Sequence, residues 1–129
     1  MLAAVANPLN YVAGWSLVLA GFVSGAAIGL GFHRDDFLGG HTSLRRRMVR
    51  LGHIAFVALG IINVVFALSP APANQTTAAI ASICFLGGGL AMPIVCFLTA
   101  WRERFRHLFF IPVTALVAAV VFTLVGALS

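Results

Sequence analysis

The sequence has 129 residues, of which 61% are hydrophobic and only 9% are charged, and its mean hydropathy is +1.06. This composition lies outside the range of soluble globular proteins and inside the range of membrane proteins. The net charge of +5 comes from short arginine clusters beside apolar segments. We therefore expect anionic lipid head groups, and no nucleic acid, among its partners.

Three long stretches, residues 1–32, 54–101 and 108–129, contain no Asp, Glu, Lys or Arg. An apolar stretch of about 18 residues or more is long enough to cross the hydrocarbon layer of a membrane as a helix. We therefore predict an all-α integral membrane protein with a single domain, residues 1–129. Its four predicted transmembrane helices cover residues 11–32, 44–68, 77–101 and 108–128.

The first predicted helix carries Gly21, Gly25 and Gly29 at four-residue spacing, with Gly14 further back on the chain. Glycines spaced in this way leave a groove on one helix face, and a second helix backbone can approach it closely. We expect this seam to pack helices within the protein. The alternative is a contact with another subunit.

The connection 33–53 carries five arginines, two aspartates and three histidines. Gly39 and Gly40 should interrupt helical structure there. Thr42 or Ser43 can then cap the second helix by accepting a backbone hydrogen bond.

Residues 69–77 contain two prolines and no charge, so they predict a turn between the second and third helices. The third helix contains Gly87–Gly89 and Pro93, which predict a kink near the middle of the bilayer. Cys84 and Cys96 would lie about 18 Å apart on this helix, too far for a disulfide. They are expected to be buried thiols.

The two basic connections, 33–53 and 102–107, hold the whole net charge of the chain. Positive residues in short loops remain on the cytoplasmic side of a membrane. We therefore predict an up-down bundle of four helices, with both basic loops in the cytoplasm and both termini outside. The expected location is a bacterial inner membrane, cytoplasmic or intracytoplasmic.

Three histidines are the best candidates for chemistry: His33, His53 and His107, which lie where the first, second and fourth helices are expected to meet the cytoplasmic interface. Imidazoles on different helices at matched depth can ligate a haem b or contact a quinone. His53 is the best single candidate because an unbroken apolar run follows it. The alternative is an interfacial or structural role for all three histidines. No catalytic residue and no metal site is predicted.

The arginines of the two connections are expected to contact lipid head groups or partner subunits. They are Arg45, Arg46, Arg47, Arg50, Arg102, Arg104 and Arg106. Asn63 is a polar residue within the second helix and must find a partner there. Its expected role is to join helices, with a cofactor contact as the alternative.

The predicted function is that of a small non-catalytic subunit of a larger membrane complex, of the electron-transfer or photosynthetic type. Nucleotide-binding, hydrolase and zinc-protease motifs are missing from the sequence. The first alternative is a membrane anchor that binds haem b or quinone. The second is a small transporter or channel built on the glycines and proline of residues 87–93, although no Asp, Glu, Lys or Arg lies in the apolar core of any predicted helix to couple ions.

Overall fold

A computed structural model describes residues 5–129, and residues 1–4 of the predicted domain lie outside the described residues. The long helices are α1 (Pro8–Phe32), α2 (Leu44–Leu68), α3 (Gln75–Trp101) and α4 (Phe110–Leu128), and two short 3-10 segments are η2 (Phe37–Gly39) and η3 (Glu103–Phe109). Four helices are long and apolar enough to cross a membrane, the fourth being counted from Glu103 through α4. The prediction of an all-helical protein with four membrane-length helices is thereby confirmed.

Capping residues account for where the helices begin. The Ser43 hydroxyl accepts a hydrogen bond from the backbone N–H of Arg46 (3.1 Å), and α2 begins at the next residue after Ser43, as the sequence indicated. The Asn74 side chain accepts hydrogen bonds from two backbone N–H groups in the first turn of α3, which therefore begins two residues before the expected position. Pro8 opens α1, where its missing N–H costs nothing.

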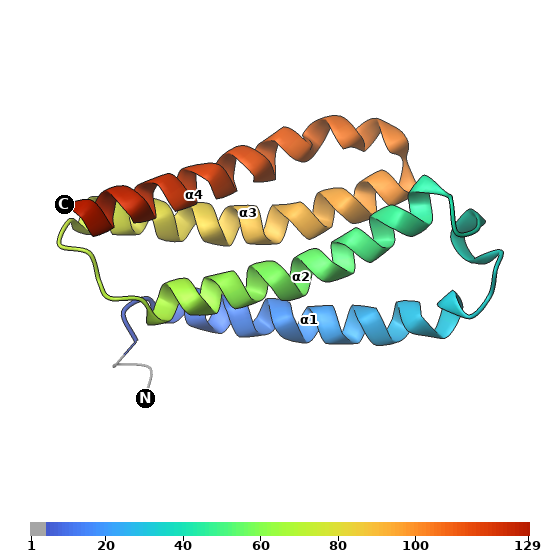
Figure 1. Cartoon of the computed structure of the whole chain (residues 1–129), viewed down its shortest axis with the longest axis horizontal. Helices are drawn as coiled ribbons and strands as arrows, with labels where there is room; N and C mark the ends of the chain where they lie inside the picture. Colours follow the sequence, from blue (N-terminus) through green and yellow to red (C-terminus); the bar gives the residue numbers. More distant parts are fainter. Residues whose placement is uncertain (1–4) are drawn as a thin grey trace.

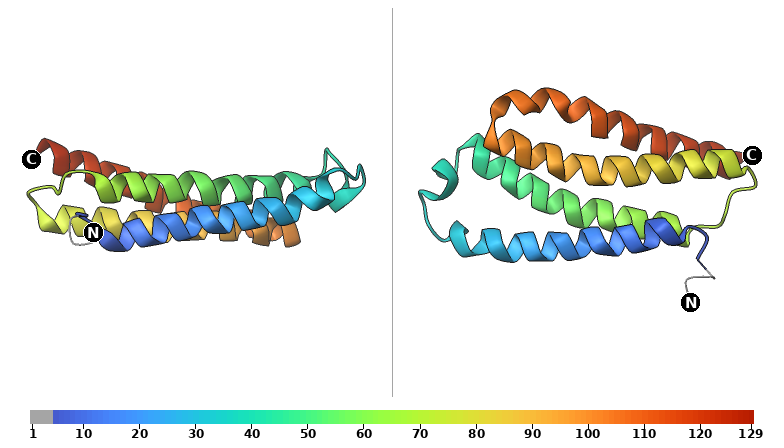
Figure 2. Two further views of the ribbon diagram at one scale, coloured as in Figure 1. Left: turned by 90° about the horizontal axis from the view of Figure 1, so that it is seen from below. Right: turned by 180° about the vertical axis from the view of Figure 1, so that it is seen from behind.

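The four helices lie side by side in a flat slab (Figures 1 and 2). Each helix packs mainly against its neighbours in the sequence, and within the described residues α1 and α4 are not packed against each other. The two basic connections lie at one end of the slab, which we call the basic end (Figure 1). Helix α1 begins and α4 ends at the opposite end, beside the connection between α2 and α3.

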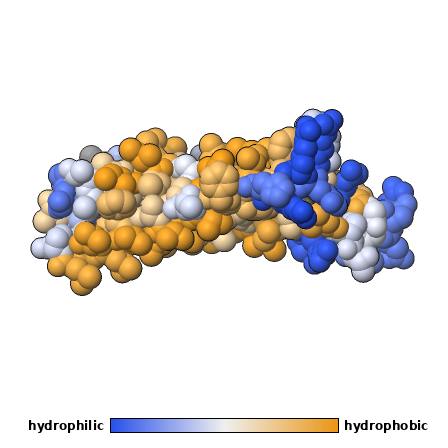
Figure 3. Space-filling model, turned by 90° about the horizontal axis from the view of Figure 1, so that it is seen from above, coloured by the Kyte–Doolittle hydropathy of each residue, from blue (hydrophilic) through white to orange (hydrophobic). Residues whose placement is uncertain are grey.

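Apolar side chains cover the length of the slab between its two ends. Figure 3 shows this band on one face, with hydrophilic residues gathered at the basic end. Large side chains such as Leu30, Ile83 and Phe110 are 78%, 68% and 64% exposed. Such a surface is stable in hydrocarbon and unstable in water.

The closest approach of two helices joins α1 to α2 at Gly14 and Gly60. A Cβ atom on Gly14 would lie 2.6 Å from the Gly60 carbonyl oxygen, and one on Gly60 would lie 2.7 Å from the Gly14 carbonyl oxygen. Further along α1, Gly21 and Gly25 accommodate side chains of α2 in the same way. These glycines therefore form a seam within the protein, because only a residue without a side chain lets the two backbones touch.

Gly29 does not belong to this seam, so the expectation that it packs helices within the protein was wrong, and its alternative contact with another subunit stays a prediction. A Cβ atom on Gly29 would meet no atom within 4 Å. The reason is that α2 turns away from α1 toward α3 as it nears the basic end (Figure 1). There Gly52 of α2 packs instead against the ring of Phe97 on α3.

Helix α3 remains one continuous helix through Pro93, and Figure 1 shows it changing direction near its middle. The neighbouring glycines serve packing: a Cβ atom on Gly88 would lie 2.7 Å from Leu116 of α4, and one on Gly89 would lie 2.9 Å from the Asn63 amide of α2. Both cysteines of α3 are free, as expected.

A closed polar network joins α1, α2 and α3 inside the apolar slab. The Asn10 amide donates to Asn63 Oδ1 (2.8 Å) and to the Ser82 carbonyl (3.3 Å), and the Ser82 hydroxyl donates to Asn10 Oδ1. The Asn63 amide donates to the carbonyls of Leu59 (3.0 Å) and Phe85 (3.2 Å). Asn10 and Asn63 are both fully buried. The network gives every amide hydrogen a partner where neither water nor lipid can provide one.

Replacement of Gly14 by alanine should force α1 and α2 apart, because its Cβ would collide with the Gly60 carbonyl. We expect Gly14→Ala to lower the free energy of unfolding by about 1–3 kcal/mol, the usual cost of an overpacked contact. Reversible unfolding in mixed detergent micelles measures this loss. Gly29→Ala is the matched control and should leave stability unchanged or slightly raised. An equal loss of unfolding free energy in the two variants would contradict a seam that includes Gly14 and excludes Gly29.

Asn63→Ala should leave the Asn10 amide and the Phe85 carbonyl short of a partner. We expect a loss of about 1–2 kcal/mol in the same unfolding measurement, the scale of interhelical hydrogen bonds in membranes. Ser16→Ala is the control, because the Ser16 hydroxyl is exposed and donates only to Val12 of its own helix. A loss in Ser16→Ala as large as in Asn63→Ala would show that the network between helices adds no more stability than a hydrogen bond within one helix.

Candidate functional site

His53 lies on the α2 face that packs against α1, where Gly25 of α1 makes room for its ring. A Cβ atom on Gly25 would lie 2.4 Å from Cε1 of the imidazole, so only glycine fits at that position. The Nδ1 atom of the ring lies 2.8 Å from the carbonyl oxygen of Gly21. The imidazole is therefore held in one orientation between two turns of α1.

Ser24 is a neighbour of His53 that the sequence analysis did not single out. Its hydroxyl donates to the Gly21 carbonyl (3.0 Å) and lies 3.5 Å from Nδ1 of His53. The three-residue spacing from Gly21 to Ser24 was visible in the sequence, but the approach of an imidazole from another helix was not.

The side of His53 that faces away from the seam opens on an apolar groove of about 500 Å³. The residues that line the groove are Phe22, His53, Ile54, Val57, Ala58 and Ile61. Within the described residues, His53 is the one member of this set with a polar side chain. The groove runs along α2 from His53 to Ile61.

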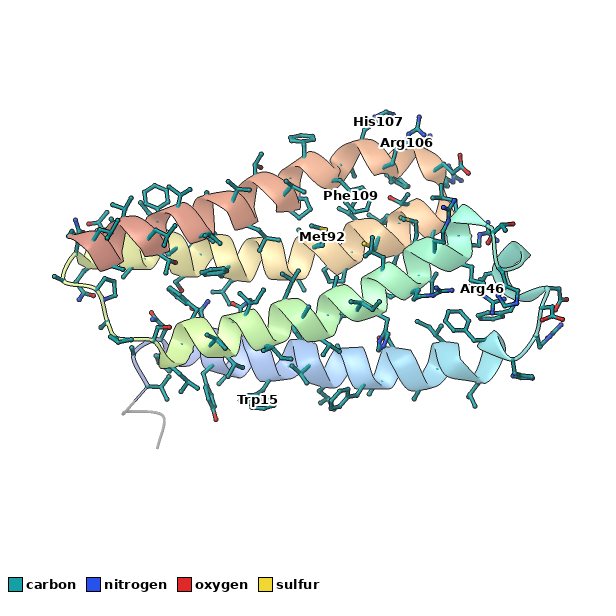
Figure 4. All side chains as sticks on the ribbon, viewed as in Figure 1. Trp15, Arg46, Met92, Arg106, His107 and Phe109 are labelled. Atoms are coloured by element: carbon teal, nitrogen blue, oxygen red, sulfur yellow. The ribbon has the colours of Figure 1, made fainter. Side chains whose placement is uncertain are left out.

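The three predicted histidines do not meet in one site. His53 faces Gly21 and Gly25, whereas His33 follows the last residue of α1, eight residues or about 12 Å beyond Gly25 along the helix axis. His107 belongs to η3 and points away from the other helices (Figure 4). Both His33 and His107 are exposed. The expectation that His33 and His53 lie at matched depth was therefore wrong, because His53 packs against Gly25 and not against the end of α1.

No group of three or more His, Cys, Asp or Glu side chains that could hold a metal ion occurs within residues 5–129. The fourth histidine, His41, pairs with Asp35 in the exposed connection that follows α1 (3.4 Å), and Arg34 pairs with Asp36 in the same connection (3.4 Å). Exposed pairs of this kind contribute little to stability.

Arg46 is buried at the basic end and holds the end of α1 (Figure 4). It is only 2% exposed. Its Nη1 donates to the carbonyl of Arg34 (3.1 Å) and its Nη2 donates to the carbonyl of Phe32 (2.9 Å). The guanidinium also lies over the Phe32 ring, 4.7 Å from the ring centroid. The carbonyls at a helix end lack helical partners and carry partial negative charge, so a cation is stabilised there.

Arg45 makes the corresponding contact on the other side of α2. Its Nε donates to the carbonyl of Ala100 (3.0 Å), in the last turn of α3. Two consecutive arginines at the start of α2 thus bind the ends of both neighbouring helices, and we call these contacts the arginine clamps. Arg46 therefore binds within the protein. The expectation that it contacts lipid head groups or partner subunits was wrong. The other arginines of the predicted lipid-contact set are exposed: Arg47, Arg50, Arg102, Arg104 and Arg106.

Comparison of the chain with protein-family models, with curated proteins and with solved structures finds no match in any of the three.

Arg46→Met should release the end of α1, because it removes two charge-assisted hydrogen bonds while keeping the length of the side chain. We expect a loss of about 2–3 kcal/mol in the free energy of unfolding, and faster amide hydrogen exchange around residues 31–37. Arg47→Met is the matched control, since Arg47 carries the same charge at the next position and is exposed. If the two variants lose the same free energy of unfolding, the hydrogen bonds of Arg46 contribute no more to stability than its charge does.

Proposed function

We propose that this protein is a small non-catalytic integral subunit of a larger membrane complex, of the electron-transfer or photosynthetic type, in a bacterial inner membrane. The single observation that supports this proposal best is the open arrangement of the four helices. In a closed four-helix bundle each helix has two neighbours. Here α1 packs mainly against α2 and touches α3 only in its first half, and α4 packs mainly against α3, so both edges of the slab present an apolar helix side.

The two edge helices differ in what they present. Helix α4 has the lowest buried share of the four candidate spans, 11%, and exposes Val117, Val121 and Leu124. Helix α1 presents Trp15, which is 52% exposed and points away from the other helices (Figure 4). Helices of other subunits are the occupants we propose for these edges, because helix packing in membranes depends on close van der Waals contact that lipid chains match poorly.

The proposed orientation places the basic end in the cytoplasm and both termini outside, in an up-down order of helices. Both arginine-rich connections lie at one end of the slab, which agrees with the rule that positive loops stay in the cytoplasm. The exposed arginines of this end would contact anionic head groups or loops of partner subunits.

The bioenergetic part of the proposal rests on His53. Imidazoles that project from a helix at membrane depth hold haems and contact quinones in such complexes. A paired ligation by His53 with His33 or His107 is no longer part of the proposal, because His33 lies about 12 Å from the level of His53 along α1 and His107 points away from the other helices. No observation favours the transporter alternative: α3 is continuous, and Leu116 and Asn63 pack against Gly88 and Gly89.

Extraction of the native membrane with a mild detergent should recover this chain in a complex with other membrane subunits. Native electrophoresis followed by mass spectrometry of the excised band identifies them. Val121→Trp on α4 should reduce recovery of the complex severalfold, because the larger ring prevents close docking while remaining soluble in lipid. Ile83→Trp, on an exposed position of α3 away from both edges, serves as the control. A chain that runs alone, monodisperse, from native membranes would contradict the proposal.

A further inference from the structure

Two arginines of the turn between α3 and α4 carry charge that nothing in the chain neutralises. The two ion pairs within residues 5–129 both lie in the connection after α1, and they take up both aspartates. Arg102 and Arg104 are exposed, and within the described residues their side chains form no ion pair and no hydrogen bond. Glu103, between them in the sequence, is exposed and also unpaired there. The two guanidinium groups are therefore free to bind an anion from outside the chain.

Aromatic rings hold both guanidinium groups at the end of α3. The Cζ atom of Arg102 lies 5.1 Å from the centroid of the Trp101 ring, and that of Arg104 lies 5.3 Å from the centroid of the Phe105 ring. A guanidinium that lies over a ring keeps the N–H donors around its edge available. Trp101 is the last residue of α3 and is 65% exposed. Exposed tryptophans at the ends of membrane helices lie at the level of the lipid head groups.

Arg45 brings a third guanidinium to the same end of α3. Its Nε donates to the carbonyl of Ala100, two residues before Arg102, and this bond fixes where the group lies. Arg45 is exposed, and among the described residues its Nη1 and Nη2 atoms have no hydrogen-bond partner. Three arginines and one glutamate, Glu103, give this end of α3 a net charge of +2. We call Arg45, Arg102 and Arg104, with the Trp101 ring, the turn site.

We propose that the turn site binds the phosphate of an anionic phospholipid, whose acyl chains lie against Trp101. Guanidinium groups bind phosphate oxygens through paired N–H donors, so several of them around one phosphate form a strong site. An exposed indole ring beside the cations fits a ligand that is charged at one end and apolar at the other, which a lipid is and an acidic protein loop is not. This inference rests on the lipid contact in the proposed function and names its ligand and its place.

The count of arginines alone would favour the other basic connection, since residues 33–53 contain five and residues 102–107 contain three. In the structure, however, Arg46 is buried and Arg45 is bound to the end of α3. The three that remain, Arg34, Arg47 and Arg50, share their connection with two aspartates and leave a net charge of +1. Arg47 also lies about 200° around α2 from Arg45, on a different side of the helix.

The two tryptophans of the chain allow a test at each end of the slab. Trp15→Phe leaves Trp101 at the turn site as the fluorophore, and Trp101→Phe leaves Trp15, which lies toward the opposite end (Figure 4). Each chain is reconstituted in vesicles of phosphatidylcholine and phosphatidylglycerol at 0.15 M salt. Bromine on the chains of one lipid at a time quenches a tryptophan in contact with it. We expect phosphatidylglycerol to be preferred about tenfold at Trp101 and less than about twofold at Trp15.

Two double variants in the Trp15→Phe chain separate the turn site from net charge. Arg102→Gln with Arg104→Gln should reduce the preference at Trp101 to within about twofold of none. Arg47→Gln with Arg50→Gln removes the same charge from the same end and should keep the preference within about twofold, because salt screens charges beyond about 8 Å. All four side chains are exposed and form no hydrogen bond within the described residues, so both variants should unfold in micelles as the parent chain does.

Equal preferences at the two tryptophans would overturn the inference, and so would an equal loss in the two double variants. Absence of any preference at Trp101 would also overturn it and leave an acidic loop of another subunit as the partner of these arginines. Failure of this test does not affect the complex recovered from native membranes, which depends on the edge helices. Failure of that recovery leaves the quenching result standing, because quenching is measured on the isolated chain.

Discussion

Hydrogen bonds between helices inside the apolar slab determine how the helices meet, because lipid offers no partner to a polar side chain. At the basic end the free carbonyls of α1 and α3 are bound by Arg46 and Arg45, which stand next to each other at the start of α2. Deeper in the slab, Asn10 and Asn63 exchange hydrogen bonds and leave no amide hydrogen free. Helix α2 takes part in all of these contacts. It is the element that holds α1 and α3 in place, because lipid provides no hydrophobic drive to do so.

The glycines adjust the distance between helices along this framework. Gly14 and Gly60 bring the backbones of α1 and α2 into contact near one end of the slab, whereas Gly52 lets α2 approach α3 at the basic end. Helix α2 therefore crosses from one neighbour to the other along its length. His53 lies where this crossing begins, so one side of its ring touches α1 and the other side is left open to the groove. The site is a consequence of helix geometry rather than of a local motif.

The open order of the helices and the groove beside His53 both support the proposed role as a subunit of a larger membrane complex. A slab with two unpaired edges suits a subunit that packs between other membrane subunits, and a single imidazole in an apolar groove suits a cofactor that is partly covered by such a neighbour. In the arginine clamps, Arg45 and Arg46 stabilise the fold itself. The other exposed arginines stay available to head groups and partner loops.

The sequence by itself determined the four helices, because apolar length, proline and capping residues act locally: Ser43 and the bounds of α2 could be read from neighbouring residues, whereas the first residues of α1, α3 and α4 differ from those expected. It also indicated that Asn63 joins helices and that glycines line a seam. The partners were decided only in the tertiary structure, because they depend on how each helix is rotated and where it diverges from the next. Gly29 shares a face with Gly25 but has no neighbour, and His33 and His53 flank the same connection but lie about 12 Å apart in depth. Arg46 turns inward while Arg47 stays exposed, and Asn10 meets Ser82 across 72 residues. Spacing along a chain cannot predict such contacts, since they arise between helices whose packing no single helix encodes.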